Sequence, residues 1–340
     1  MTDEPYNPSA EDALIARYFK PLATDPGAYG LGDDAAILAA HGDDLVVTTD
    51  AIVEGVHFLP EDPPDTVARK ALRVNLSDLA AKGATPAGFV LTLALRSADE
   101  AWLQPFARGL GEDAAHFACP LLGGDTVSTP GPLMISITAF GRLPAGRMVH
   151  RSGAQPGDRI VVTGTIGDAM LGLDVLRGGA VAAALADDAA ARQALVQRYR
   201  LPQPRNALAA AVHDHAHAAM DVSDGLAGDL AKLCAASGAS AAIDIASIPL
   251  SVPAAALLAR GVTSIEAILS GGDDYEVLCA ISKNRFEAFA QAARLAGVAV
   301  NSIGTVLAGS SAPRFLDAQG REAALRRLSY SHFEGFLPKL

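Results

Sequence analysis

Short apolar runs typical of β-strands alternate with longer amphipathic segments typical of α-helices along most of this chain. Such an irregular alternation favours an α/β (α+β) fold, in which helices cover a sheet, over a helical bundle or a β-sandwich. Strands are predicted at Leu45–Val47, Gly88–Leu95, Leu133–Phe140, Arg159–Thr163, Ala241–Ile245, Tyr275–Ile281 and Val298–Val306. Helices are predicted near Ser9, at Thr66–Lys82 and Asp99–Phe117, in Ala-rich stretches from Asp168 to Tyr199 and around His213–His217, and at Leu226–Ser237 and Phe286–Ala296.

The segment 142–159 interrupts this alternation, because it carries three Gly and two Pro and no helical period. A chain of 340 residues is long enough for two domains with real cores. We therefore predict an N-terminal domain at 1–148 and a C-terminal domain at 149–340.

The formal net charge of −11 argues against nucleic acid and anionic membranes as partners, because both require clustered Lys and Arg. No run of about 18 apolar residues predicts a membrane span. The N-terminus, MTDEPYN, has no signal-peptide character. The three scattered cysteines suggest neither disulfides nor a zinc site. We expect a cytoplasmic protein.

Acidic residues recur beside Gly, Ser or Thr, and most of them end or follow an apolar segment. Any one of them has a simpler explanation as a helix cap or an Asx-turn. Together they suit hard cations held by oxygen ligands, and Mg²⁺ takes only one or two carboxylates each, so several ions would be needed. The set comprises Asp33, Asp34, Asp50, Asp78, Asp125, Asp221, Asp224, Asp273, Asp274 and Glu276.

Helix geometry bears on one member of this set. Asn75 and Asp78 fall on one stripe of the helix predicted at Thr66–Lys82, beside an apolar stripe of Leu72, Leu76 and Leu79. The two polar side chains therefore project together from a helix whose other side is core. A merely solvated polar face explains the same spacing.

No P-loop and no G-x-G-x-x-G motif is present. Residues 164–168 (GTIGD) follow a strand and offer either an anion site at a helix start or a tight turn. An acidic protein that binds phosphates without a P-loop needs divalent metals to bridge its carboxylates to the phosphates. His57, seven residues after Asp50, is a candidate for a polar contact near such a site or for simple packing.

Several segments together resemble the thiamine-monophosphate kinase family, of the superfamily that also holds aminoimidazole ribonucleotide synthetase, selenophosphate synthetase and a hydrogenase maturation protein. They follow the family's order over most of the chain. The segments are GLGDDAAIL (30–38), VVTTDAIVEGVHF (46–58), NLSDLAAKGATP (75–86), GGDTV (123–127), RSGAQPGDRIVVTGTIGDA (151–169), MDVSDGL (220–226) and SGGDDYEV (270–277).

The resemblance implies a two-domain aminoimidazole ribonucleotide synthetase-like fold, with a mixed sheet in an N-terminal dimerisation domain and an α/β C-terminal domain. It implies ATP-dependent phosphorylation of thiamine phosphate to thiamine diphosphate by direct in-line transfer, with no covalent nucleophile. It also implies a homodimer with the strands Gly88–Leu95 and Leu133–Phe140 at the interface.

The resemblance also implies site residues. A cluster of Mg²⁺ ions would be held by Asp33, Thr48, Thr49, Asp50, Asp78, Asp125, Asp221 and Asp224. ATP would contact Gly124, Asp125, Arg151 and Ser223, and the substrate would contact His57, Asp273 and a C-terminal aromatic. For that aromatic we choose Phe333 over Tyr330 and Phe336.

The chain departs from the family at position 273, where the family commonly has Glu and this chain has Asp. Either Asp273 or Glu276 could therefore make the substrate contact. The alternatives are a sister enzyme of the superfamily or a non-catalytic nucleotide-binding scaffold. No cysteine before Cys119 could serve as the reactive residue of a selenophosphate synthetase. The complete set of acidic motifs argues against a scaffold.

Overall fold

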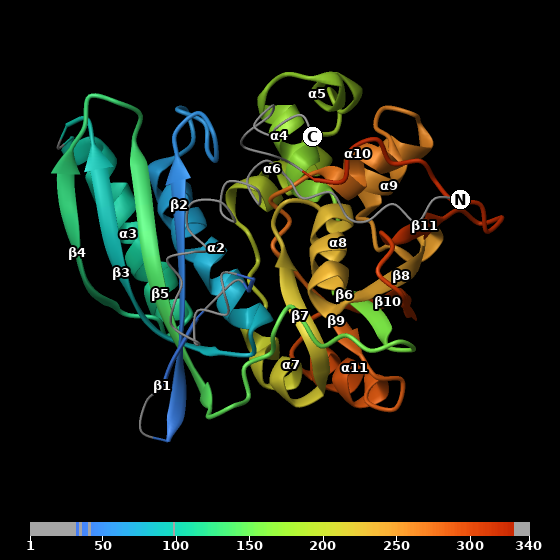
Figure 1. Cartoon of the computed structure of the whole chain (residues 1–340). Coiled ribbons are helices and arrows are strands. Elements are labelled where there is room, and N and C mark those ends of the chain that lie inside the picture. Colours follow the sequence, from blue (N-terminus) through green and yellow to red (C-terminus); the bar gives the residue numbers. More distant parts are fainter. Residues whose placement is uncertain (1–31, 34–35, 40–41, 98, 330–340) are drawn as a thin grey trace, which may run out of the picture.

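The computed structural model describes residues 32–33, 36–39, 42–97 and 99–329, which form two lobes, each built on its own β-sheet (Figure 1). The sheets are five- and six-stranded and share no strand. The first ends at Pro144 and the second begins at Arg159, so the changeover falls in the Gly- and Pro-containing segment. The helix predicted near Ser9 lies outside the described residues.

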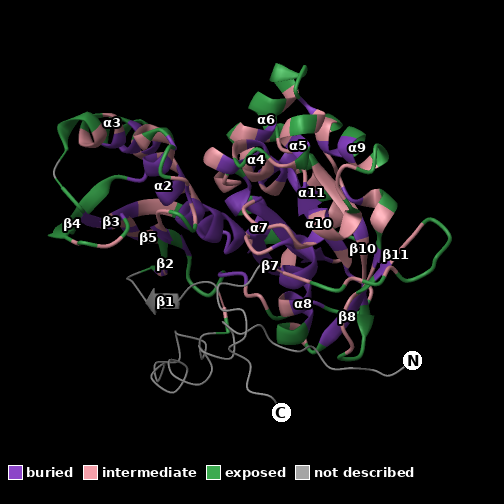
Figure 2. Cartoon of the chain, turned by 90° about the horizontal axis from the view of Figure 1, so that it is seen from above, coloured by how far each residue is buried: buried purple, intermediate pink, exposed green. Residues whose placement is uncertain are grey.

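The N-terminal sheet has the strand order β1-β2-β5-β3-β4 and is antiparallel except for the parallel pair β3–β4. A mixed sheet was expected. Helices α2 and α3 cover one face (Figure 2). The elements are β1 (Ala36–Ala39), β2 (Asp43–Val53), α2 (Pro64–Ala81), β3 (Thr85–Leu95), α3 (Glu100–His116), β4 (Leu121–Ser128) and β5 (Met134–Pro144).

Alternation along β5 shows which face is core. Ile135 and Ile137 are buried toward the helices, whereas the alternating residues Ser136 and Thr138 are only half-buried. Among the described residues, no helix covers the second face. Side chains of β2 and its neighbours therefore point either into the core beneath the helices or to the face that no described helix covers.

Helix α2 begins with Pro64, whose fixed φ suits the first helical position, and carries Asp65 in its first turn. Its leucine stripe (Leu72, Leu76 and Leu79) is fully buried against the N-terminal sheet. Near its C-terminal end, Ala80 and Ala81 belong to the core of the other lobe. A helix with two buried sides therefore joins the lobes and lies between their cores.

The C-terminal sheet has the order β11-β8-β10-β6-β9-β7 and is antiparallel except for β11–β8. Helices α8 and α10 pack on one face, and α7 and α11 pack on the other. The elements are β6 (Arg159–Thr163), α4 (Asp168–Leu176), α5 (Ala180–Ala184), α6 (Ala189–Arg200), η4 (Asn206–Leu208), α7 (Ala209–His215), β7 (Ala216–Val222), α8 (Leu226–Ser237), β8 (Ala239–Asp244), η5 (Ile245–Ser247), α9 (Val252–Ala259), α10 (Ile265–Ser270), β9 (Glu276–Ile281), α11 (Phe286–Leu295), β10 (Val300–Ala308) and β11 (Arg314–Leu316).

Two strands that matter for the site were not predicted. Strand β4 is made of a Gly-Gly-Asp sequence with low strand propensity, and its pairing with β3 imposes the extended form. The Ala-rich stretch around His213–His217 was predicted as one helix, but α7 ends at His215 and β7 follows. Ala favours helices, but the Ala residues of β7 adopt an extended conformation because the neighbouring strand β9 supplies their backbone hydrogen-bond partners.

No helix in the described part of the chain has both the length and the hydropathy needed to cross a bilayer.

Candidate active site between the lobes

A cavity of about 460 Å³ lies between the two lobes and takes its walls from both. The N-terminal lobe contributes residues of β2, the turn after it and α2. The C-terminal lobe contributes residues of α4, α6 and α10 and the loops at 223–224 and 270–275. The lining comprises Asp50, Ala51, Ile52, Val56, His57, Val74, Ala169, Met170, Leu173, Arg177, Tyr199, Ser223, Asp224, Ala267, Ser270, Gly271, Gly272, Asp273, Tyr275 and Arg327.

Three predicted metal ligands approach one another beside this cavity: Asp50 from β2, Asp78 from α2 and Asp221 from β7. The strand predicted at Leu45–Val47 is longer than expected, since β2 continues through Asp50 to Val53 and pairs with β5 over its whole length. The backbone N–H of Asp50 donates to Asn75 Oδ1 at 3.0 Å. The polar stripe of α2 therefore fixes the strand as well as presenting Asp78.

Asp78 is buried and accepts a hydrogen bond from Thr48 Oγ1 at 2.5 Å. Burial, followed by the charges of Asp221 and Asp50, raises the pKa of Asp78 well above its usual range. Burial and the charge of Asp229 likewise raise the pKa of Asp221. Carboxylates that disfavour one another's ionised form are the donor set that a divalent cation stabilises.

No group of three or more His, Cys, Asp or Glu side chains has a geometry ready to hold a metal within the described ranges. The three acids are electrostatic neighbours without forming a closed cage.

The loop after β7 supplies Ser223 and Asp224, and a buried acid holds it in place. Asp229 Oδ2 accepts hydrogen bonds from the backbone N–H groups of Ser223 and Asp224, both at 3.0 Å. Lys232 Nζ donates to Asp224 Oδ2 at 2.6 Å. Asp229 was not predicted from the sequence, although an acid in the first turn of α8 is a known signal for a helix start.

Asp33 forms an ion pair with the fully buried Lys82 (Oδ1 to Nζ, 2.6 Å). The backbone N–H of Arg151 donates to its other oxygen at 2.8 Å. Burial alone would raise the pKa of Asp33, but Lys82 and hydrogen bonds from His150 and Arg151 lower it to about 2. The charge of Lys82 also reaches Asp78 and Asp221, so Asp33 is linked to the acid cluster through this lysine.

Two further N-terminal candidates, Thr49 and Asp125, have side chains on the opposite face of the sheet from Asp50. Strand register aligns Ala51 with Ser136, Thr92 and Asp125, whereas Asp50 aligns with the buried Ile137. Asp125 and Thr49 therefore point away from α2. Asp125 also lies three strand spacings, about 14 Å, from β2. Within one chain the structure does not bring Thr49, Gly124 and Asp125 to the cavity.

Gly124 has a backbone reason to be glycine. A Cβ atom at this position would lie 1.9 Å from the carbonyl oxygen of Leu91 on the paired strand. The Gly-Gly-Asp motif thus allows close pairing of β4 with β3, whatever else it contacts.

His57 and Asp273 face the cavity from opposite lobes. His57 Nδ1 accepts a hydrogen bond from the backbone N–H of Val53 at 3.0 Å, so the neutral ring carries its proton on Nε2. Asp273 has a left-handed backbone, with φ of 71°, and its N–H donates to the carbonyl of Ser223 at 2.8 Å. Phe333, Tyr330 and Phe336 lie outside the described residues.

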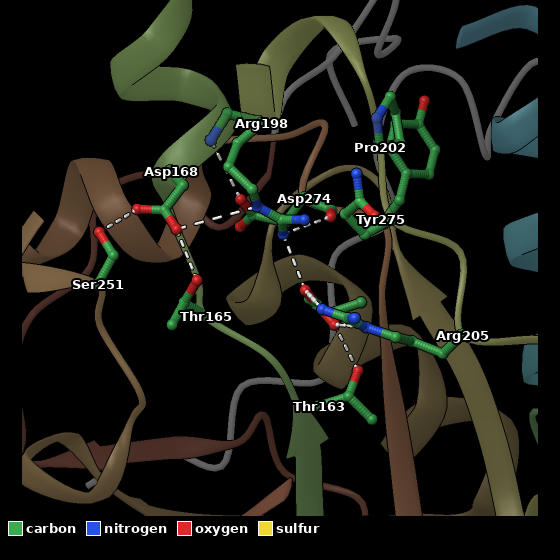
Figure 3. Close-up of polar contacts among 12 residues, drawn as sticks. Thr163, Thr165, Asp168, Arg198, Pro202, Arg205, Ser251, Asp274 and Tyr275 are labelled. Carbon is green, nitrogen blue, oxygen red and sulfur yellow. Dashed lines mark hydrogen bonds and ion pairs between the residues drawn. The ribbon is translucent and has the colours of Figure 1, made fainter. Parts of the chain in front are cut away.

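Glu276 is fully buried and does not line the cavity. Its carboxylate pairs with Arg198 and Arg205 and accepts a hydrogen bond from Thr163 at 2.6 Å (Figure 3). Of the two acids, only Asp273 lines the cavity.

Asp274, also fully buried, occupies the anion position that the sequence offered at residues 164–168. Its Oδ2 accepts from the backbone N–H of Gly167 at 2.7 Å, at the N-terminal end of α4 (Figure 3). Burial raises the pKa of Asp274 to about 8 despite these donors. The backbone N–H of this loop therefore binds a carboxyl group of the protein itself.

Comparison with known proteins places this geometry in a family. The models for AIR synthase related protein match the chain at residues 32–143 (N-terminal domain) and 155–314 (C-terminal domain). A thiamine-monophosphate kinase of Caulobacter vibrioides is 46% identical over 331 residues, which are 96% of this chain and 91% of the relative. The chain belongs to the thiamine-monophosphate kinase family. As a member of it, the chain is a kinase.

Solved structures agree. AaThiL complexed with AMPPCP and TMP has a TM-score of 0.76 and 30% identity, covering 90% of this chain and 97% of that chain. Thiamine-monophosphate kinase from Stenotrophomonas maltophilia has a TM-score of 0.74 and 37% identity, covering 94% of this chain and 100% of that chain. The family and the two-domain fold class predicted from the motifs are confirmed.

Proposed function

We propose that this protein phosphorylates thiamine phosphate to thiamine diphosphate with ATP. The observation that carries the proposal is a cavity with buried, mutually repelling carboxylates beside it and a His57–Asp273 pair facing across it. The family membership and the AMPPCP and TMP bound by AaThiL support the same substrates.

The residues divide the work by position. Asp50, Asp78, Asp221 and Asp224 would hold Mg²⁺, with Thr48 orienting Asp78 through its hydroxyl. Bound Mg²⁺ supplies charge neutralisation for the phosphates and their transferring group. Ser223 and Arg151 contact ATP, and His57, Asp273 and Phe333 contact the acceptor substrate.

Transfer is direct, because positioning and electrostatic stabilisation are sufficient for phosphoryl transfer. The three cysteines are all buried, and burial raises the pKa of Cys119 to about 11 and of Cys234 and Cys279 to about 12. Such thiols are poor nucleophiles at neutral pH.

The assembly and the remaining ligands belong to the same proposal. A cytoplasmic homodimer forms through the N-terminal domain, 1–148, while 149–340 completes the substrate site. Thr49, Gly124 and Asp125 act with Asp33 on metal and ATP. Strand β4 is an edge strand, and at least half of Leu121 and of Leu122 is exposed to solvent. This exposed apolar surface supports an interface at the β4 edge of the sheet.

The test is ADP production by purified protein with ATP and Mg²⁺, offered thiamine phosphate, thiamine or aminoimidazole precursors. We expect turnover only with thiamine phosphate, and its loss with a chelator. Asp50→Asn should lose at least about 100-fold in kcat, because it removes charge but keeps the backbone bond to Asn75. Asp187→Asn, at an exposed site, is the matched control.

Two results would contradict the proposal. Turnover of an aminoimidazole precursor would indicate a sister enzyme. ATP binding without turnover of any acceptor would indicate a scaffold.

A further inference from the structure

Lys70 is a buried lysine that joins the two lobes beside the cavity without lining it. It lies in α2, and its side chain is 2% exposed. Its Nζ forms an ion pair with Asp273 Oδ2 at 2.8 Å and donates to the carbonyl oxygen of His57 at 2.8 Å. The same Nζ lies 3.7 Å from the centre of the Tyr199 ring.

The carbonyl of His57 receives a second donor from the other lobe. Tyr199 OH donates to it at 3.2 Å. Burial, followed by the nearby charge of Asp273, raises the pKa of this phenol, so the hydroxyl keeps its proton and remains a donor. Two donors on one carbonyl fix the turn after β2, and that turn carries the His57 ring.

The Asp273 side chain also needs a contact that holds its carboxylate in one position. Asp273 and Tyr275 both have positive φ, 71° and 51°, a conformation that side chains other than glycine adopt at a cost. The Lys70 contact determines where the Asp273 carboxylate sits. Oδ1 makes no hydrogen bond to any described residue, whereas Oδ2 is held by the lysine.

We propose that Lys70, with Tyr199, is a positioning residue that sets the separation of His57 and Asp273 and thereby the affinity for the acceptor substrate. The inference rests on the proposed function, in which these two residues contact thiamine phosphate. Lys70 takes no part in the chemistry, and ATP binding does not depend on it.

The variants Lys70→Met and Tyr199→Phe test the proposal. Met keeps most of the apolar length and removes both polar contacts, whereas Phe removes only the hydroxyl. We expect the KM for thiamine phosphate to rise at least tenfold in Lys70→Met and about threefold in Tyr199→Phe. The KM for ATP should stay within twofold. The Kd for thiamine phosphate, measured by calorimetry, should change with its KM.

The control is Arg200→Gln, which breaks another bridge between α6 and the N-terminal lobe, from Arg200 Nε to Asp62 Oδ1 at 2.6 Å. It should lower the thermal midpoint without changing either KM by more than twofold. Adding Lys70→Met to Asp273→Asn should cost little more than either change alone, because the pair acts as a unit.

The outcomes separate the two proposals. Native protein that does not turn over thiamine phosphate contradicts the proposed function. If the native protein turns over thiamine phosphate but Lys70→Met leaves its KM unchanged, only the role of Lys70 is contradicted. The same holds if Lys70→Met raises the KM values for ATP and thiamine phosphate equally. It also holds if Arg200→Gln raises the KM for thiamine phosphate as much as Lys70→Met does. Should Lys70→Met fail to fold, Tyr199→Phe decides, and an unchanged acceptor KM there overturns the proposal.

Discussion

The carboxylate of Glu276 is fully buried and pairs with two arginines that are only partly exposed. One carboxylate joins Arg198 from α6, Arg205 from the following loop and Thr163 from β6 (Figure 3). The group holds the start of β9 against β6, so the strained residues Asp273 and Tyr275 just before it have a fixed anchor. A residue read from the sequence as a ligand candidate thus has a structural role.

Replacing Glu276 with Gln should destabilise the protein strongly. The substitution keeps the volume but leaves two arginines facing one buried neutral group, which costs about 3–5 kcal/mol in the free energy of unfolding. Glu287→Gln on the exposed side of α11 is the control and should change stability by less than about 0.5 kcal/mol. Urea unfolding of both variants measures the difference, and equal stabilities would refute the role of Glu276.

Asp274 should make stability depend on pH. Its pKa is raised from 3.8 to about 8 in the folded protein, so the folded state binds a proton that the unfolded state has lost. Stability should therefore fall as pH rises between about 5 and 8, by about 1.4 kcal/mol per pH unit from this group, and level off above that range.

Asp274→Asn tests this dependence, because an amide resembles the neutral acid and does not titrate. Unfolding free energies in urea should decline with pH less steeply in this variant than in the native protein. Asp187→Asn, at an exposed site, should keep the native slope. Parallel curves for Asp274→Asn and the native chain would show that Asp274 stays ionised.

At the scale of elements, the packing of α3 on α2 controls where the polar stripe of α2, which holds Asn75 and Asp78, points. Gly109 makes this packing possible, since a Cβ there would lie 2.6 Å from the carbonyl oxygen of Asp65 at the start of α2. Gly111, two residues along the same helix, faces open space. The helix therefore contains its own matched control.

Gly109→Ala should lower the free energy of unfolding by about 1–3 kcal/mol, because backbone atoms of α2 cannot move aside without disturbing the core. Gly111→Ala should raise it by about 0.5–1 kcal/mol through helix propensity alone. Urea midpoints compare the two. Equal stabilisation of both variants would mean that α2 and α3 pack less closely than described.

At the scale of the whole molecule, an edge strand with exposed leucines is a surface that a second chain can bury. Leu122 is 61% exposed on β4. We expect size-exclusion chromatography with light scattering to give twice the mass of one chain, and Leu122→Asp to shift it to the monomer. Leu295→Asp, on α11 and 83% exposed, should leave the mass unchanged. A native monomer would refute the proposed dimer.

The sequence by itself determined the family, the fold class and most of the elements. Hydrophobic periodicity fixes β6 and α8 to the residue, because local pattern and burial agree there. It also placed Asn75 and Asp78 together, since helical spacing fixes which side chains share a face. The ordered motifs were specific enough to identify the family.

Only the tertiary structure decided which of the acids face the cavity and which lie elsewhere. Strand register turned Asp50 toward α2 and Asp125 to the other face, and register is set by pairing between distant segments. Burial separated Asp273, which lines the cavity, from Glu276, which ends in a buried ion-pair network. Lys70 carried no sequence signal, because its partners lie up to 203 positions away along the chain. Contacts of that kind depend on how the two lobes pack, and no local pattern records them.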